Sequence, residues 1–233
     1  MSEESIASAI RAALEVDGDI NMHASAITIN VEDVIHLEGE VADIIAKRKA
    51  LRIAHQHAGG LPIEDRLRLV PGERIANDQL RDAALDALRR EPALAEIDIN
   101  TGTDAPSGQD RDWIRVTAVD CAIKVTGEVK SLSHRRFAEV LLWWLPGSCD
   151  IYNRLHVRPP QADHDEEITD VVRMVFDKEP TLDAEQISAV TRDREVTLRG
   201  AVTSEAQKQT AARDVWYIPG VHAVHNELEV LSR

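Results

Sequence analysis

The feature that most constrains the fold of this chain is an internal repeat, which occurs three times with the same spacing and no gaps. Each copy starts at a glycine, and identical residues follow it 2, 11, 20 and 28 positions later. A fixed period of this kind is typical of a chain built from several similar structural units. The repeated positions are Gly39, Val41, Ala50, Gly59 and Leu67; Gly127, Val129, Ala138, Gly147 and Leu155; and Gly200, Val202, Ala211, Gly220 and Leu228.

The repeat predicts three small domains of similar design along the 233 residues. Short segments that contain proline, at 70–73 and 158–161, separate the copies. A domain of roughly 70 to 90 residues is just large enough to bury a modest core. An insertion near 101–112 lengthens the second copy by a polar loop with Gly and Pro, which we expect to be exposed. The expected domains are therefore residues 1–71, 72–160 and 161–233.

Hydrophobic periodicity predicts the same order of elements in every copy. In the third copy Ile168 and Val172 have helical spacing, and Val196 and Leu198 alternate as in a half-buried strand. A hairpin, a second helix and a final strand complete the unit, and a right-handed crossover should make the last two strands parallel. In the second copy the stretch 97–99 is a candidate for an added strand. The expected fold class is α+β, with three tandem helix–strand–strand–helix–strand sandwiches, each a small mixed three-stranded sheet with two helices on one face.

The repeated glycines are expected to be structural. The first glycine of each copy ends the second strand, where the lack of a Cβ suits a bulge, a positive φ or a close approach of the backbone. The second glycine ends the second helix, where glycine is a common cap. The repeated leucine is expected to be buried in the parallel neighbour strand. The six structural glycines are Gly39, Gly127, Gly200, Gly59, Gly147 and Gly220.

The acidic composition excludes some classes of partner. The formal net charge is −14, and binding of nucleic acid needs clustered Lys and Arg, so we expect no nucleic-acid partner. The first residues lack the apolar core of a secretory signal, and the longest apolar cluster, 140–146, is far too short to span a bilayer. We therefore expect a cytoplasmic protein, at most peripheral to a membrane. A reducing cytosol would keep Cys121 and Cys149 as thiols, although a disulfide between them stays open.

No motif of the sequence indicates catalysis or a cofactor. The closest histidine pairs are His55 with His57 and His222 with His225, whereas a zinc site needs three or four ligands. We therefore expect solvated histidines and no metal. The sequence has no Gly-x-Ser-x-Gly elbow and no glycine-rich phosphate loop. The expected protein is not an enzyme and carries no cofactor.

The repeated pattern resembles the BON domain family, named after bacterial osmotically regulated and nodulation proteins. The second copy keeps Pro146 and Asn153 of the pattern, whereas Ala58 and Asp65 stand at these positions in the first copy. The resemblance implies the same sandwich in three tandem copies. It also implies non-enzymatic binding, commonly to phospholipid or envelope surfaces and often in stress-related proteins. In the third copy, the closest match, the resemblance rests on 196–202, Ala211 and 218–230.

An aromatic cluster in the second copy is the main candidate contact surface. Two apolar stripes on the second helix, which ends at Trp143 and Trp144, form a wide apolar face. One interpretation packs one stripe on its own sheet and the other on a neighbouring unit; the alternatives are a wedge for a membrane interface and a homo-oligomer contact. Basic residues also recur eight positions after the first glycine of each copy. They could contact phosphate head groups, or they could simply form the solvated side of the helix. The candidate membrane or partner contacts are Trp143, Trp144, Arg135, Arg136 and Lys47.

The resemblance to the BON domain family implies a bacterial binding protein that is associated with stress, including osmotic stress. The leading hypothesis is docking on phospholipid or another component of the cell envelope through the repeated units. One alternative is a cytosolic sensor or binder of a small ligand or ion, which would use clefts between the repeats. The other alternative is an oligomeric structural scaffold.

Overall fold

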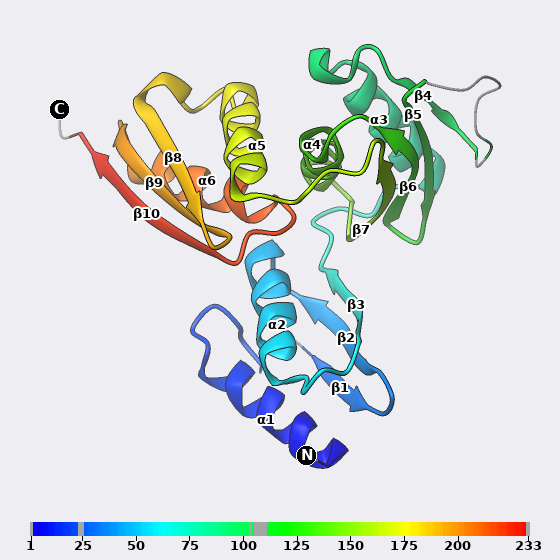
Figure 1. Cartoon of the computed structure of the whole chain (residues 1–233), viewed down its shortest axis with the longest axis vertical. Helices are drawn as coiled ribbons and strands as arrows, with labels where there is room; N and C mark the ends of the chain where they lie inside the picture. Colours follow the sequence, from blue (N-terminus) through cyan, green and yellow to red (C-terminus); the bar gives the residue numbers. More distant parts are fainter. Residues whose placement is uncertain (1, 23–25, 103, 105–110, 232–233) are drawn as a thin grey trace. The chain divides into compact units, whose positions relative to one another are not determined.

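The chain divides into two compact units, Met1–Val70 and Pro71–Arg233, and each is considered by itself (Figure 1). The coordinates are a computed structural model, which describes residues 2–22, 26–102, 104 and 111–231. The first unit contains one small sheet and the second unit contains two. We call the two parts of the second unit the four-stranded half and the C-terminal half, after their sheets.

The first unit has two helices packed on a mixed three-stranded sheet. Ser2 caps the first helix by accepting a hydrogen bond from the backbone of Ser5, and Asp43 caps the second in the same way from Ala46. The strand order is β1-β2-β3, with β1 antiparallel and β3 parallel to β2. The core lies between helices and sheet, and Leu67 of β3 is fully buried in it. The elements are α1 (Glu3–Val16), β1 (Thr28–Val31), β2 (Ile35–Val41), α2 (Ile44–His57) and β3 (Ile63–Leu69).

The four-stranded half repeats this arrangement and adds one strand at the edge. Its order is β4-β5-β6-β7, so the expectation of three strands is wrong here, and β4 forms where the stretch 97–99 pointed to a further strand. Burial of Ile99 and hydrogen bonds from Arg115 to Asp98 hold β4 against the edge of β5. Of the expected polar loop, residues 103 and 105–110 lie outside the described residues. The elements are α3 (Asn77–Arg89), η1 (Pro92–Leu94), β4 (Asp98–Thr101), β5 (Trp113–Val119), β6 (Ala122–Val129), α4 (Leu132–Trp143) and β7 (Asp150–Val157).

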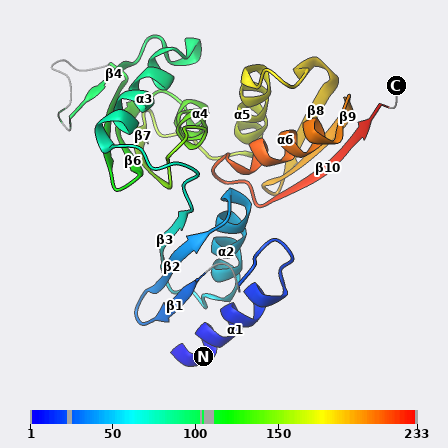
Figure 2. The same cartoon turned by 180° about the vertical axis from the view of Figure 1, so that it is seen from behind.

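The C-terminal half again has two helices and three strands, in the order β10-β9-β8. Figure 2 shows α6 lying along β9 and β10. The strand β8 is antiparallel and β10 is parallel to the central strand β9. The expected α+β fold class is thus confirmed in all three sheets. The elements are α5 (Asp165–Lys178), η2 (Ala184–Gln186), β8 (Ile187–Arg192), β9 (Glu195–Val202), α6 (Glu205–Trp216) and β10 (Ala223–Val230).

The repeated glycine and leucine face each other across the parallel strand pairs. Leu228 pairs with Gly200, and the same register joins Leu155 to Gly127 in the four-stranded half. The leucines are buried, as expected, and the backbone of Gly200 has φ +127°. The strands continue for two residues beyond each glycine, which corrects the expectation that the glycine ends the strand. The reason is that a neighbouring stretch of backbone passes close over the glycine. This approach needs only the absence of a Cβ and not a break in the strand.

Candidate binding sites

The two tryptophans lie at the contact between the halves of the second unit. Trp143 is only 6% exposed, its ring centre lies 6.5 Å from that of Tyr217, and its indole N–H donates to Glu139 at 3.4 Å. Trp144 is half-buried, and its side chain hydrogen-bonds to the carboxylate of Asp214. Tyr217 and Asp214 both belong to the C-terminal half. The apolar face of α4 therefore packs on a neighbouring part of the chain, and Trp143 has no free surface to enter a membrane.

Asp214 is the most strongly perturbed acid in this contact. Its side chain is 2% exposed, and its Oδ2 atom has no hydrogen-bond partner among the described residues. Burial raises the pKa of Asp214 to about 7, and the negative charge of Glu179 adds to the increase. Arg213 and the hydrogen bond from Trp144 act in the opposite direction but are outweighed. The contact thus contains a carboxyl group that changes its charge near neutral pH.

Two arginines, Arg135 and Arg136, and two carboxylates, Glu139 and Asp163, line a small cleft that also lies between these halves, and Arg194 lies beside it. Arg136 of α4 is buried, donates from Nε to the carbonyl of Pro219 at 3.0 Å and forms an ion pair with Asp163 at 2.6 Å. Arg194, from the β8–β9 turn, contacts the other oxygen of Asp163 at 3.1 Å. Half-buried Arg135 lines the same cleft, which encloses about 170 Å³. One carboxylate thus serves two guanidinium groups beside a cavity.

Electrostatics favours the anionic form of the shared carboxylate in this cleft. Burial alone would raise the pKa of Asp163, but the hydrogen bonds and charges of Arg136 and Arg194 outweigh it and hold the pKa below its usual value. Arg136 keeps one further donor, because its buried Nη1 has no hydrogen-bond partner among the described residues. A Cβ on Gly220 would lie 3.0 Å from Arg194 and 3.3 Å from Arg136, so the glycine makes room for both guanidinium groups.

Lys47 is buried, so the expectation of a basic contact on the surface is wrong for this residue. Its ammonium group lies 2.9 Å from Asp65 and also donates to the carbonyl of Leu67. Elsewhere the repeat has asparagine where the first unit has Asp65: Asn153 donates to the carbonyl of Arg135, and Asn226 to that of Lys208. An aspartate cannot make this donation. In the first unit Lys47 turns inward instead, and its ammonium group donates to the carboxylate of Asp65 and to the carbonyl of Leu67.

We expect Lys47→Met to lower the free energy of unfolding of the first unit by about 2 kcal/mol, because it removes the counter-ion of the Asp65 carboxylate. The double variant Lys47→Met/Asp65→Asn should recover most of this loss, since the introduced asparagine can donate to the helix carbonyl as in the other copies. Hydrogen exchange of the buried amides of β2 measures the first unit, because all four tryptophans lie in the second. The single variant Asp65→Asn completes the comparison. If the loss of stability in the double variant equalled the sum of the losses in Lys47→Met and Asp65→Asn, this account of Lys47 would be wrong.

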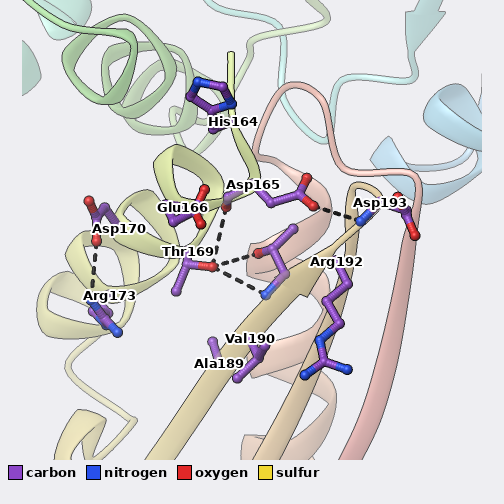
Figure 3. Close-up of a pocket in the computed structure, with 11 residues that line it drawn as sticks. His164, Asp165, Glu166, Thr169, Asp170, Arg173, Ala189, Val190, Arg192 and Asp193 are labelled. Carbon is purple, nitrogen blue, oxygen red and sulfur yellow. Dashed lines mark hydrogen bonds and ion pairs between the residues drawn. The ribbon is translucent and has the colours of Figure 1, made fainter. Parts of the chain in front are cut away.

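A larger groove lies in the C-terminal half between the start of α5 and the edge strand β8 (Figure 3). It encloses about 740 Å³. The hydroxyl groups of Thr169 and Thr191 are 2.8 Å apart across it, and the backbone N–H of Thr191 donates to Thr169 at 3.2 Å. Asp165 closes one end, because its carboxylate accepts from the backbone N–H of Asp193 and of Arg194 at 2.6 and 3.0 Å. These hydrogen bonds tie the turn end of the β8–β9 hairpin to the start of α5.

The first unit has a groove at the same place in its own fold. It encloses about 400 Å³ between the start of α1, with Glu3 and Glu4, and the edge strand β1. Residues 29–32, at the end of β1 and just after it, line this groove, and residues 189–192 line the groove beside β8. The sheet registers show that the two grooves lie at equivalent places. Ile29 pairs with Leu37, which lies two residues before Gly39. In the same way Ala189 pairs with Leu198, which lies two residues before Gly200.

A disulfide joins Cys121 and Cys149 in the four-stranded half. It connects the β5–β6 turn to the segment before β7, and the backbone N–H of Cys149 also donates to the carbonyl of Cys121 at 2.9 Å. In the C-terminal half His222 and Arg194 make the corresponding backbone hydrogen bond at 2.8 Å. The structure thus corrects the expectation of two free thiols. Disulfides are typical of oxidising compartments, so the reducing cytosol that we expected does not account for the pair.

Neither a metal cluster nor a membrane-spanning helix is found within the described residues. No group of three or more His, Cys, Asp or Glu side chains there could hold a metal ion. His225 instead lies 2.8 Å from Glu195 on the exposed face of its sheet. No helix in the described ranges is both long and apolar enough to cross a bilayer.

The fold defines small two-layer α+β domains, two of which have equivalent surface grooves. The BON domain profile matches residues 2–71 and 164–232, which together exceed half of the chain, and the chain belongs to the BON domain family. BON domains are binding domains rather than catalytic ones, and the family is associated with phospholipid binding and with stress. The two matched regions contain the two equivalent grooves.

Comparison with other known proteins adds little to this assignment. No curated protein matches the chain. Two solved structures of CdsD, a structural protein of the type III secretion system of Chlamydia trachomatis, are each 12% identical to it. The first, a C-terminal domain, has a TM-score of 0.27 with 100% of both chains covered, and the second has a TM-score of 0.26 with 97% of this chain and 92% of the other covered. At such low scores the likeness carries no argument about function.

Sequence reasoning located some of the site residues and missed others. Arg135 and Arg136 do lie at one cleft, whereas Lys47 belongs to the other unit and Trp143 is buried. Asp163, Arg194 and Asp214 were not singled out. Only the position of Arg194 in the hairpin turn signalled that its side chain would project from the sheet. The two grooves had no sequence signal, because their walls are ordinary helix and strand residues.

Proposed function

We propose that the chain is a stress-associated binding protein, without enzymatic activity, that docks on anionic phospholipid and holds a lipid phosphate in the arginine cleft. We also propose that residues 72–160 form a third BON domain between those at 1–71 and 161–233. The register of Gly127 with Leu155 and the two helices packed on that sheet support this third copy. An envelope surface rich in anionic lipid is then the natural partner.

The arginine cleft carries this proposal. Arg136 is buried, and the NH2 group at its Nη1 has no partner among the described residues, which is costly unless a ligand or water accepts its hydrogens. Arg135 and Arg194 lie beside the same cavity, and arginine is the preferred residue for phosphate because its planar fork can donate two hydrogen bonds at once. A phosphate oxygen that reached Arg136 would satisfy the unpaired donor.

The net charge of −14 opposes approach to an anionic membrane, but it does not decide local binding. Charges on a solvated surface are screened beyond a Debye length, about 8 Å at physiological salt. The arginines of the cleft are within this distance of a bound phosphate, whereas most of the acidic side chains are spread over the chain. Binding should therefore be weak in the absence of the cleft and should decrease as salt is raised.

Sedimentation with vesicles of phosphatidylcholine and phosphatidylglycerol tests the proposal. At low salt we expect the protein to sediment with these vesicles and not with phosphatidylcholine alone. Arg135→Glu should weaken the binding about tenfold, because it adds a carboxylate to the cleft without removing a buried group. Arg90→Glu is the matched control, since Arg90 is highly exposed in the same unit and lies outside the cleft.

Two results would overturn this function. One is the absence of sedimentation with anionic vesicles at low salt. The other is an equal loss of binding in Arg135→Glu and Arg90→Glu, which would indicate a diffuse effect of charge. Glycerol 3-phosphate in solution should compete with the vesicles for wild-type protein if a lipid phosphate occupies the cleft.

A further inference from the structure

The edge strand beside each groove is open in both regions that match the BON domain. In the C-terminal half β8 is an edge of the three-stranded sheet, and in the first unit β1 occupies the corresponding edge. The grooves of about 740 and 400 Å³ lie against these strands. An open edge beside a groove is where a further strand can be added to a sheet.

The hairpin register shows which backbone groups of β8 point to the open edge. Arg192 and Glu195 flank the two-residue turn, so the backbone groups of Ala189 and Thr191, at alternate positions, point away from β9. The N–H of Thr191 donates to Thr169. The N–H and C=O of Ala189 have no partner among the residues that the structure describes. Ala189 thus offers a donor and an acceptor at the edge of the groove.

The four-stranded half shows how this edge is filled within the same chain. There β4 lies parallel to β5 and pairs as far as Thr101 with Val116. Val116 corresponds to Ala189, because the two have the same place relative to the first repeated glycine of their copies. In each copy the residue two positions earlier on the same strand pairs with that glycine. The fold therefore accepts a parallel strand at this position without change in the rest of its sheet.

The side chains around the groove favour a basic occupant. The groove beside β8 has the carboxylates of Asp165, Glu166, Asp170 and Asp193 and the guanidinium groups of Arg173 and Arg192. Arg173 is already paired with Asp170 at 3.1 Å. The groove of the first unit has three glutamates, Glu3, Glu4 and Glu32, and one arginine, Arg66. Figure 3 shows Asp165, Glu166 and Asp170 along the start of α5, beside the edge strand.

We propose that the open edge of β8 binds an extended segment of a partner polypeptide that carries Lys or Arg, as an added strand parallel to β8. The partner backbone pairs with Ala189, in the way that β4 pairs with Val116. The basic side chains that face α5 meet Glu166 and Asp170. The edge of β1 in the first unit is a second site of the same kind. This interaction is separate from the arginine cleft and does not depend on lipid binding.

A synthetic peptide of alternating Lys and Val, about eight residues long, is the probe for this site. In the full-length protein we expect the peptide to shift the amide NMR signal of Ala189 and to slow the hydrogen exchange of that amide. A matched peptide with Glu in place of Lys should bind at least about tenfold more weakly. Equal binding of the two peptides, or binding that leaves the Ala189 amide unprotected, would overturn the proposal.

Two variants separate the backbone contribution from the charge contribution. Ala189→Pro removes an N–H that the sheet itself does not use, and proline is tolerated on edge strands, so it should abolish binding at β8. Asp170→Lys should weaken binding of the Lys peptide about tenfold even if the proline variant does not fold. Asp177→Lys is the control, because it makes the same change of charge on the exposed side of α5 outside the groove. A similar loss with Asp177→Lys would contradict the assigned site.

Discussion

Replacement of Gly200 by alanine is expected to lower the free energy of unfolding of the second unit by more than about 4 kcal/mol. A Cβ at this position would lie far inside the van der Waals contact distance of the carbonyl oxygen of Gln186. The obstacle is backbone, so it cannot move away as a flexible side chain could. The backbone of Gly200 also has φ +127°, a conformation that residues with a Cβ rarely adopt. Urea unfolding followed by tryptophan fluorescence measures the effect.

The matched control for this substitution is Gly72→Ala in the same unit. A Cβ on Gly72 would have no neighbour within 4 Å, and this glycine does not have a positive φ. We expect its effect to stay within about 0.5 kcal/mol. Gly127→Ala should behave like Gly200→Ala, since its Cβ would meet the carbonyl of Trp113 in the same way. An unfolding midpoint for Gly200→Ala equal to that of Gly72→Ala would contradict this expectation. It would show that the two backbone segments can move apart at Gly200 with little loss of stability.

Replacement of Asp214 by asparagine should remove a loss of stability that the wild-type protein suffers as the pH rises. The folded protein holds the proton of Asp214 up to a pKa of about 7, whereas the unfolded chain releases it near 3.8. Between these values the folded state binds more protons, so stability falls with rising pH, and the cost remains above pH 7. Asparagine resembles the protonated acid and can still accept from Trp144. At pH 8 the variant should be more stable by roughly 3 kcal/mol.

Urea unfolding at pH 5 and at pH 8 measures this difference. The advantage of Asp214→Asn should be clearly smaller at pH 5 than at pH 8, because the cost of releasing the proton grows from the unfolded pKa of 3.8 up to the folded pKa of about 7. Asp177→Asn serves as the control, because Asp177 is an exposed carboxylate in the same half and should change stability little at either pH. If Asp214→Asn retained the pH dependence of the wild type, the source of that dependence would lie elsewhere in the contact.

The sequence alone was sufficient for the repeated unit of the fold, because the repeated residue types follow from requirements of the backbone. The repeated glycine and leucine, Gly127 and Leu155 in the second copy, are 28 residues apart in every copy. The spacing is constant because a helix of similar length carries the chain from one strand to its parallel neighbour. The absence of a Cβ at the crossing and the burial of the leucine are local requirements, and local requirements appear directly as residue types. The resemblance to the BON domain family rested on the same positions.

The direction in which polar side chains turn was decided only by the tertiary structure. Lys47 and Arg135 occupy the same position of the repeat, yet Lys47 is buried because Asp65 needs a donor, whereas Arg135 remains half-exposed. Arg136 meets Asp163, 27 residues away, and Pro219, 83 residues away. Such contacts depend on how one sheet packs on the next, and no periodicity along the chain encodes them. The added strand β4 and the disulfide between Cys121 and Cys149 depend on long-range pairing in the same way.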